Sequence, residues 1–282
     1  MEQPQGLFDE YGRRIPYTGM RVFPQAGGHS RRYYYLNQPA VMDYHAGYRL
    51  TKQYFKLEDI PFSAEDYQQE LVGMSEGISH DGSLLNLFAG VHVPFIGPPQ
   101  APGVKRGAEL RGFVDAAGRS FKNDYPKYDF HDLSGKFLES DIGLAGGSRY
   151  ERLEEARSRG WIVGWYFPNC LSEYDLASQR KQMTTLPDYV QASGDRRAMI
   201  VLSGGVEAAA ALIGCPGLLH NETNYPHHLC LAALTDPDEN FFYSFEAYGH
   251  DLVFNRRTNM LTPSVTQISE QFAGGLTVFT AM

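Results

Sequence analysis

One thiol in this chain has the sequence context of a nucleophile. Cys170 follows the apolar run Trp161–Phe167 and precedes an expected helix. The positive end of a helix dipole stabilises a thiolate and lowers the pKa of a cysteine placed there. His228, at the start of a later expected strand, supplies an imidazole, and either Asp236 or Asn240 follows in the next turn. Together these residue types could carry out attack by a thiolate on an amide carbonyl.

The order of these groups along the chain resembles that of papain-like amide hydrolases. The resemblance implies an enzyme in which Cys170 attacks, His228 exchanges protons and Asp236 orients the imidazole. The residues that usually surround the nucleophile in that family are absent here. A cysteine next to an apolar strand is also commonly a buried core residue with a raised thiol pKa and little reactivity. We therefore expect Cys170 to be structural and no residue to be catalytic, with thiol hydrolysis as the alternative.

A second stretch has the form of a phosphate-binding loop. Ser203, Gly204 and Gly205 stand between an apolar strand, residues 200–202, and an alanine-rich helix that begins at Val206. Backbone amides at the N-terminus of a helix can bind phosphate. Glycines between a strand and a helix are also ordinary turn residues.

The spacing of this loop resembles the pyrophosphate-binding loop of the ATP pyrophosphatase family, which implies nucleotide binding. Glu207 and Ala208 stand where that family has an aspartate and a hydroxyl residue, and too little chain follows for the rest of such a domain. We therefore expect Ser203, Gly204 and Gly205 to form a turn that binds no nucleotide, and we expect no other cofactor.

Histidines gather in the C-terminal half, close in sequence to two cysteines. They are His220, His227, His228 and His250, with Cys215 and Cys230 nearby. Neither a His-x-His nor a Cys-x-x-Cys spacing occurs, and adjacent histidines on a strand point to opposite faces. We expect these histidines to be structural or exposed, and we expect no metal site.

The C-terminal run has the clearest pattern of elements. Apolar or aromatic strands are expected at 225–234, 241–248 and 252–255, separated by the turn-rich segments 235–240 and 249–251. Ser264 and Gln267 form a capping-box signature for a helix at Val265–Ala273, and Gly274 would end it. This pattern predicts an α+β fold in which an antiparallel β-meander sheet carries packed short helices.

The rest of the chain is less regular. We expect strands at 21–23, 32–36, 48–51, 84–88, 91–95 and 161–167, helices opened by Ser63 and by Ser148, a helix at 171–183, and a Pro/Gly-rich loop at 97–107. Residues 1–147 would form a β-rich N-terminal half of unassigned role, and residues 148–282 an α+β C-terminal domain. One continuous fold is the alternative.

A further resemblance covers the C-terminal portion. Leu186-Pro187-Asp188-Tyr189, a short helix stopped by Gly194, the meander and the final capped helix resemble the SUKH superfamily of immunity-type proteins. The resemblance implies a non-catalytic protein that binds another protein, such as a toxin. A structural subunit of a particle or assembly is another alternative, because the chain combines 29 glycines, 16 prolines and many aromatic residues.

Composition limits the partners. The formal net charge is −8 and neither half of the chain is basic, so nucleic acid is an unlikely ligand. No stretch of 18 apolar residues occurs, and the start of the chain lacks the apolar core of a signal peptide, so we expect no membrane span or export signal. The odd number of cysteines, 3, favours reduced thiols in the cytoplasm.

Overall fold

The protein has an α+β fold, seen in a computed structural model that describes residues 6–17, 35–57, 60–139, 142–172, 174–192, 194–223, 226–258 and 272–282. The α-helices are α1 (Tyr44–Tyr54), α2 (Ala64–His80), α3 (Arg106–Asp124), α4 (Glu151–Arg159), α5 (Leu176–Gln182) and α6 (Val206–Gly214), and the short 3-10 helices are η1 (Leu87–Ala89), η2 (Gly135–Glu139) and η3 (Pro216–Leu219). The strands are β1 (Val93–Gly97), β2 (Phe130–Asp132), β3 (Gly143–Leu144), β4 (Ile162–Phe167), β5 (Tyr189–Gln191), β6 (Arg197–Leu202), β7 (His228–Cys230), β8 (Leu234–Thr235), β9 (Phe241–Tyr248), β10 (Asp251–Thr258), β11 (Phe272–Ala273) and β12 (Leu276–Ala281).

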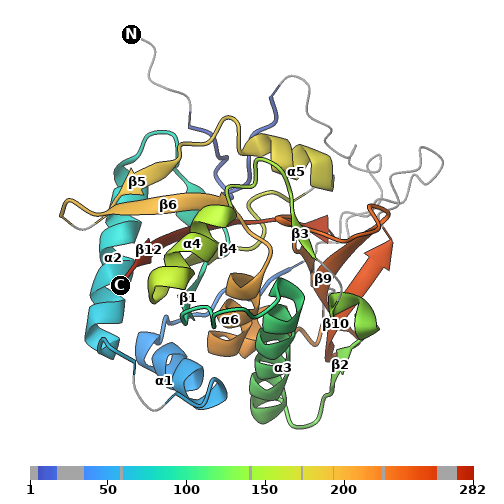
Figure 1. Ribbon diagram of the computed structural model, residues 1–282. Helices are drawn as coiled ribbons and strands as arrows, with labels where there is room; N and C mark the ends of the chain where they lie inside the picture. The colour runs from blue at the N-terminus through green and yellow to red at the C-terminus, as the bar shows by residue number, and fades with distance from the viewer. Residues whose placement is uncertain are drawn as a thin grey trace.

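The first sheet is antiparallel throughout, with the strand order β1-β4-β12-β6-β5 (Figure 1). Every residue of β4 is buried, as expected for an apolar strand with neighbours on both sides. The last strand of the chain, β12, lies between β4 and β6 and so completes the centre of this sheet.

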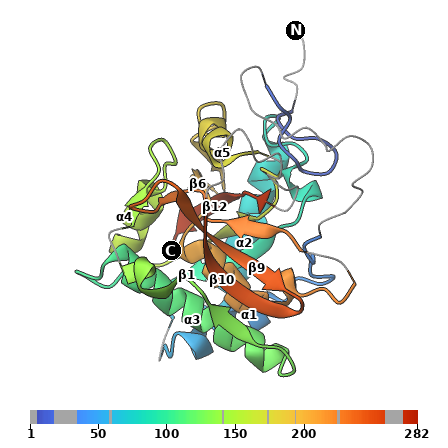
Figure 2. The same ribbon diagram turned by 90° about the vertical axis from the view of Figure 1, so that its right-hand side faces the viewer.

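The second sheet has the order β11-β7-β9-β10-β2 and lies beside the first (Figure 2). Its main feature is the hairpin of β9 and β10, in which Phe241 pairs with Thr258 and Tyr248 with Asp251. The edge strands β2 and β11 are short and run parallel to their neighbours. A two-stranded ladder of β3 and β8 stands apart from both sheets.

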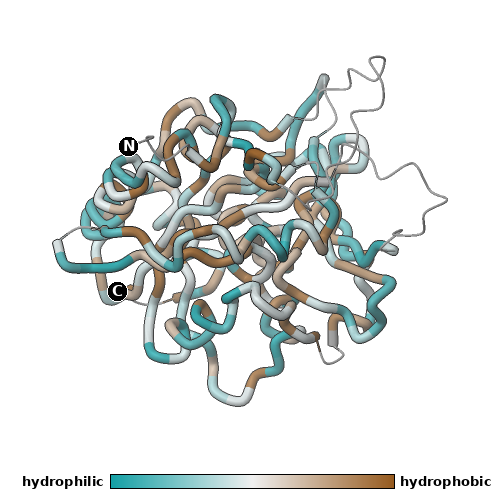
Figure 3. The backbone as a smooth tube through the Cα atoms, turned by 90° about the horizontal axis from the view of Figure 1, so that it is seen from above, coloured by the Kyte–Doolittle hydropathy of each residue, from teal (hydrophilic) through white to brown (hydrophobic). Residues whose placement is uncertain are grey.

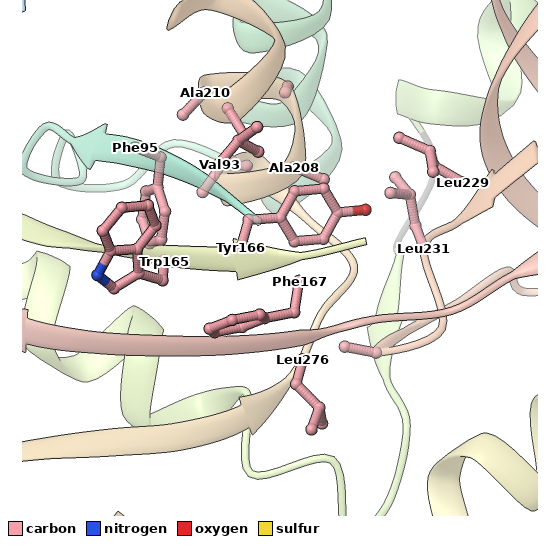
Figure 4. Close-up of a cluster of buried hydrophobic side chains, with 14 of the residues drawn as sticks. Val93, Phe95, Trp165, Tyr166, Phe167, Ala208, Ala210, Leu229, Leu231 and Leu276 are labelled. Carbon is pink, nitrogen blue, oxygen red and sulfur yellow. The ribbon is translucent and has the colours of Figure 1, made fainter. Parts of the chain in front are cut away.

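One hydrophobic core joins the two sheets. Figure 4 shows Tyr166 of β4 among side chains of α6 and of the β7 region, with Ala208 and Leu231 near its ring. Helix α6 packs on β1 and α3, and in the backbone view the polar segments lie mainly along the outline of the molecule (Figure 3). Burial of these side chains provides most of the favourable free energy of folding.

Elements on both sides of residue 147 share these sheets. Strand β1 pairs with β4, and β2 pairs with β10. The stretches 1–147 and 148–282 therefore contribute to the same two sheets and the same core.

The expectation of a β-rich N-terminal half is wrong, because α1, α2 and α3 dominate its described part. The expected strand at 48–51 lies inside α1: the Asp43 carboxylate caps this helix, which buries Gly47, Thr51 and Tyr54 at helical spacing. The expected strand at 84–88 is a turn followed by η1, since the Asp81 carboxylate accepts the Ser83 amide. The strand expected at 91–95 is present as β1, whereas 21–23 and most of 32–36 lie outside the described residues.

Two helix predictions in the C-terminal half also need correction. The segment after Leu186 is not a helix but β5, whose Tyr189 pairs with Met199, and Gly194 lies in the turn to β6. The helix expected at 171–183 begins later, because the Asp175 carboxylate caps it by accepting the Ser178 amide. Most of the helix expected at Val265–Ala273 lies outside the described residues, and its last two residues form β11.

Several elements are confirmed. Ser63 and Asp66 form the expected capping box of α2. Helix α4 ends before Gly160, and α6 begins at Val206. Strand β9 coincides with the expected strand at 241–248 and forms the expected antiparallel hairpin with β10.

Candidate functional site

The Cys170 thiol is enclosed by the core. Only 1% of the residue is exposed, and its Sγ lies 3.4 Å from the carbonyl oxygen of Phe167. Burial raises the pKa of the thiol to about 12, although backbone hydrogen bonds and the charge of Arg14 oppose the shift. Cys170 therefore remains a neutral thiol at physiological pH. Among the described residues, no histidine forms a hydrogen bond with it.

His228 lies next to a different carboxylate from the one expected. Strands β7 and β9 pair so that His228 stands near Glu246, with its Nδ1 3.8 Å from the Glu246 Oε1. Arg257 donates two hydrogen bonds of 2.6 Å to the same carboxylate, and Ser244 donates one of 2.5 Å. Burial lowers the pKa of His228, with Glu246 opposing and Arg257 adding to the shift.

Asp236 belongs to a separate group of side chains. Its carboxylate accepts two hydrogen bonds of 2.7 Å from Arg256 and one of 2.6 Å from the Tyr243 hydroxyl. Burial alone would raise the pKa of Asp236, but these hydrogen bonds bring it below the ordinary value. Arg256 and Arg257 are consecutive in β10 and point to opposite faces of the sheet. The described contacts therefore do not assemble Cys170, His228 and Asp236.

The Arg256 guanidinium is also enclosed by two aromatic rings. It lies 3.5 Å from the ring centre of Phe241 and 4.2 Å from that of Phe137 in η2. Cation–π contact and the planar salt bridge hold the guanidinium in one orientation. This stack of Phe137, Arg256 and Phe241 is called the aromatic platform below.

The aromatic platform reaches the surface beside β10. Phe137 is 46% exposed, although its side chain is apolar. The adjoining turn presents Asp238 and Glu239, which are exposed. Large apolar side chains held in place next to polar residues are typical of the centre of a protein interface. We take the aromatic platform as the candidate functional site.

The Ser203-Gly204-Gly205 turn is filled by the protein's own side chains. The Glu207 carboxylate accepts the Gly204 amide at 2.6 Å, and the Tyr150 hydroxyl accepts the Val206 amide at 3.1 Å while donating to Glu207. Burial raises the pKa of Glu207 despite these hydrogen bonds. The amides that a phosphate would need are thus already used.

Close packing explains the glycines of this turn. A side chain at Gly205 would collide with the Tyr150 hydroxyl. Gly204 has a φ of +148°, and its α-carbon faces the backbone of Leu231 and Ala232. Ser203 is buried and lies 2.7 Å from the Thr277 hydroxyl of β12. The turn thus packs against Tyr150, against the backbone of Leu231 and Ala232, and against β12.

The described residues also bear on metal binding and on membrane insertion. In these ranges, no three His, Cys, Asp or Glu side chains converge in a way that could hold a metal ion. None of the helices described is long and apolar enough to cross a membrane.

Comparison with known proteins gave no match: no family model, no curated protein and no solved structure is detectably similar to this chain.

Sequence reasoning missed the residues that complete both clusters on β10. No sequence pattern distinguished Glu246 from the other residues of its aromatic strand. The third strand was expected to end at Asn255, before Arg256 and Arg257. A signal was available in the pair Arg256-Arg257, because neighbouring strand residues face opposite sides and each buried arginine needs an acid. Phe137 had no comparable signal, since it lies in a polar stretch without periodicity.

Proposed function

We propose that the protein is a non-catalytic binding protein that recognises another protein through the aromatic platform. The observation that carries this proposal is that Phe137 remains 46% exposed while its ring packs on a fixed arginine. An anchor that is already rigid loses little conformational entropy when a partner covers it. The resemblance of the C-terminal sequence to the SUKH superfamily of immunity-type proteins supports the same function, with a toxin as one possible class of partner.

The charge of the chain favours a basic partner. The formal net charge is −8, and the exposed Asp238 and Glu239 adjoin Phe241. Charge complementarity accelerates association and disfavours partners of the same sign. A cationic protein with an apolar side chain to cover Phe137 would fit this surface.

The contacts of the other chemical groups support binding over catalysis. The Cys170 thiol is buried with a raised pKa. At the glycine turn, the Gly204 amide donates to Glu207 and the Val206 amide donates to the Tyr150 hydroxyl. All three cysteines are free thiols, which is compatible with the reducing environment of the cytoplasm, where we propose that the protein acts.

Site-specific photo-crosslinking tests the proposal. A photoreactive phenylalanine analogue at Phe137 should capture a basic protein in cells of the source organism, whereas the same analogue at Val72 should not. Val72 is 39% exposed on α2, on the opposite side of the molecule from β10 (Figure 1). Equal capture at both positions, or capture of acidic proteins only, would contradict the proposal.

The captured protein should then be purified and its affinity measured. We expect Phe137→Ser to weaken binding by at least about tenfold, as for a central apolar anchor, and Val72→Ser to leave it unchanged. Affinity should also fall with added salt. Light scattering of the protein alone distinguishes a small oligomer from the subunit of a particle, and a large closed assembly would favour the latter.

A further inference from the structure

Two histidines and two tyrosines pack together where the β9–β10 turn meets the end of α3. The ring centres of Tyr125 and His220 are 4.1 Å apart, and the Tyr128 ring lies 5.0 Å from both His220 and His250. The two imidazole centres are 6.0 Å apart. These four residues, called the His–Tyr cluster, come from three segments far apart in sequence. They therefore fasten the tip of the hairpin to the body of the protein.

The surroundings of one histidine of this cluster, His220, favour its neutral form. The Nδ1 atoms of His220 and His250 are both buried, and neither has a hydrogen-bond partner among the described residues. In a neutral imidazole, one ring nitrogen carries no proton and can remain without a donor at modest cost. A protonated imidazole carries N–H groups on both nitrogens, so a buried N–H without an acceptor would result.

The surrounding charges do little to favour protonation. The charged and titratable groups on the segments packed around the cluster are Lys122, Asp124, Lys127, Asp129, His131, Glu222, Tyr248 and Asp251. The Asp251 carboxylate accepts the Asp129 amide and lies 3.3 Å from the His131 Nε2. Lys122 forms an ion pair with Asp129. Glu222 is the carboxylate that acts on His220.

We propose that the His–Tyr cluster is a pH-sensitive latch, which holds the β9–β10 turn against α3 near neutral pH and releases it in mild acid. Protonating His220 would place a positive charge among packed rings and would leave the buried N–H group at its Nδ1 without an acceptor. Opening the cluster brings this group into water. Arg256 of the aromatic platform lies near the other end of β10. Opening the latch would therefore affect the strand that carries the aromatic platform.

The direction of the pH effect follows from His220. Burial lowers its pKa from the ordinary 6.5 and the nearby His250 adds to this, while Glu222 and the His250 backbone oppose it. A base whose pKa is lower in the folded state stabilises that state fully above its unfolded value. This contribution is lost as the pH falls below about 6.5 towards the folded value.

Hydrogen–deuterium exchange at pH 7.5 and pH 5.5 tests the latch directly. After correction for intrinsic rates, amides 247–252 should exchange about tenfold faster at pH 5.5, whereas the amides of β4 should not change. Proton NMR of wild-type protein should give His220 a pKa below 6.5. Unchanged exchange at 247–252, or a pKa of 6.5 or above for His220, would overturn the proposal.

Variants that keep a ring but cannot be protonated separate the latch from general acid sensitivity. His220→Phe and His220→Tyr should each reduce the acid response of amides 247–252 by at least about half, and His45→Phe should retain it in full. His45 is an exposed residue of α1 and is the matched control. If one His220 variant fails to fold, the other and the wild-type titration still decide. A full acid response in either folded variant would refute the latch.

Discussion

Arg256 and Arg257 are neighbours in β10, yet they belong to two different environments. Each donates two hydrogen bonds to one buried carboxylate, Asp236 for Arg256 and Glu246 for Arg257. On one face, the guanidinium lies between two phenylalanine rings, and its side chain is 10% exposed. On the other face, the Arg257 side chain is 36% exposed and shares its carboxylate with Ser244 and His228.

This difference shows how one strand can provide two kinds of ion pair. Two aromatic rings cover the ion pair of Arg256 and Asp236, so this pair holds in place a surface to which a partner can bind. The Arg257 pair keeps one side in water and includes a titratable imidazole. A buried charge that cannot regain water is costly to leave unpaired, whereas a partly exposed one is less so. The two pairs should therefore respond differently to the same substitutions.

Removing the carboxylates should give the largest contrast. We expect Asp236→Ala to reduce the free energy of unfolding by about 4 kcal/mol, because the largely buried Arg256 side chain loses its carboxylate partner. Glu246→Ala should cost only about 2 kcal/mol, because Arg257 can turn into solvent. Urea unfolding followed by circular dichroism measures both.

Asp238→Ala is the matched control for this pair, since it removes an exposed carboxylate from the turn that contains Asp236. It should change the free energy of unfolding by no more than about 0.5 kcal/mol. A larger loss for Glu246→Ala than for Asp236→Ala would contradict the contrast between the two faces.

Replacing each arginine with lysine should give a smaller contrast. Lysine keeps the positive charge but lacks the planar fork and the stacking surface. Arg256→Lys loses both the bidentate bond and the contact with two rings, for an expected cost of about 2 kcal/mol. Arg257→Lys loses only the bidentate geometry, at about 1 kcal/mol. Equal costs in thermal or urea unfolding would show that the rings contribute nothing to the Arg256 pair.

The hairpin that carries both pairs was largely predictable from its sequence, because its signals are local. The aromatic run Phe241–Tyr248 and the turn residues before and after it define β9 and its partner. The capping box at Ser63 and the stop at Gly160 defined helix ends for the same reason. Where two local signals competed, as at Tyr48–Thr51, helical spacing of buried residues prevailed over strand-forming residue types.

The candidate site was not predictable, because it depends on pairing between distant segments. His228 stands beside Glu246 only through the register of β7 and β9, and the connection between them contains the separate strand β8. Phe137 reaches Arg256 from a 3-10 helix that no periodicity marks. Asp236 was expected to orient His228. Asp236 instead pairs with Arg256, and His228 lies beside the carboxylate that pairs with Arg257. These consecutive arginines of β10 lie on opposite faces of the sheet.

The smallest expected contrast between the two faces is in their pH dependence. Burial lowers the pKa of His228 from the ordinary 6.5, so its stabilising contribution is complete above 6.5 and is lost as the pH falls below that value. For Asp236, burial is outweighed by hydrogen bonds and its pKa is lowered from 3.8, so its contribution is lost only as the pH falls below about 4. Between pH 7.5 and 5.5, only the Arg257 face should therefore weaken.

The measurement is the change in unfolding free energy over this interval for wild type and for His228→Gln, with Asp236→Asn as the comparison. Other histidines, including His220, affect all three proteins equally and cancel in the differences. We expect His228→Gln to lose less stability than wild type on acidification, by at most about 1 kcal/mol, and Asp236→Asn to lose as much as wild type. If His228→Gln followed the wild-type curve, the imidazole would not titrate within the Glu246 network, and the two faces of β10 would differ in exposure alone.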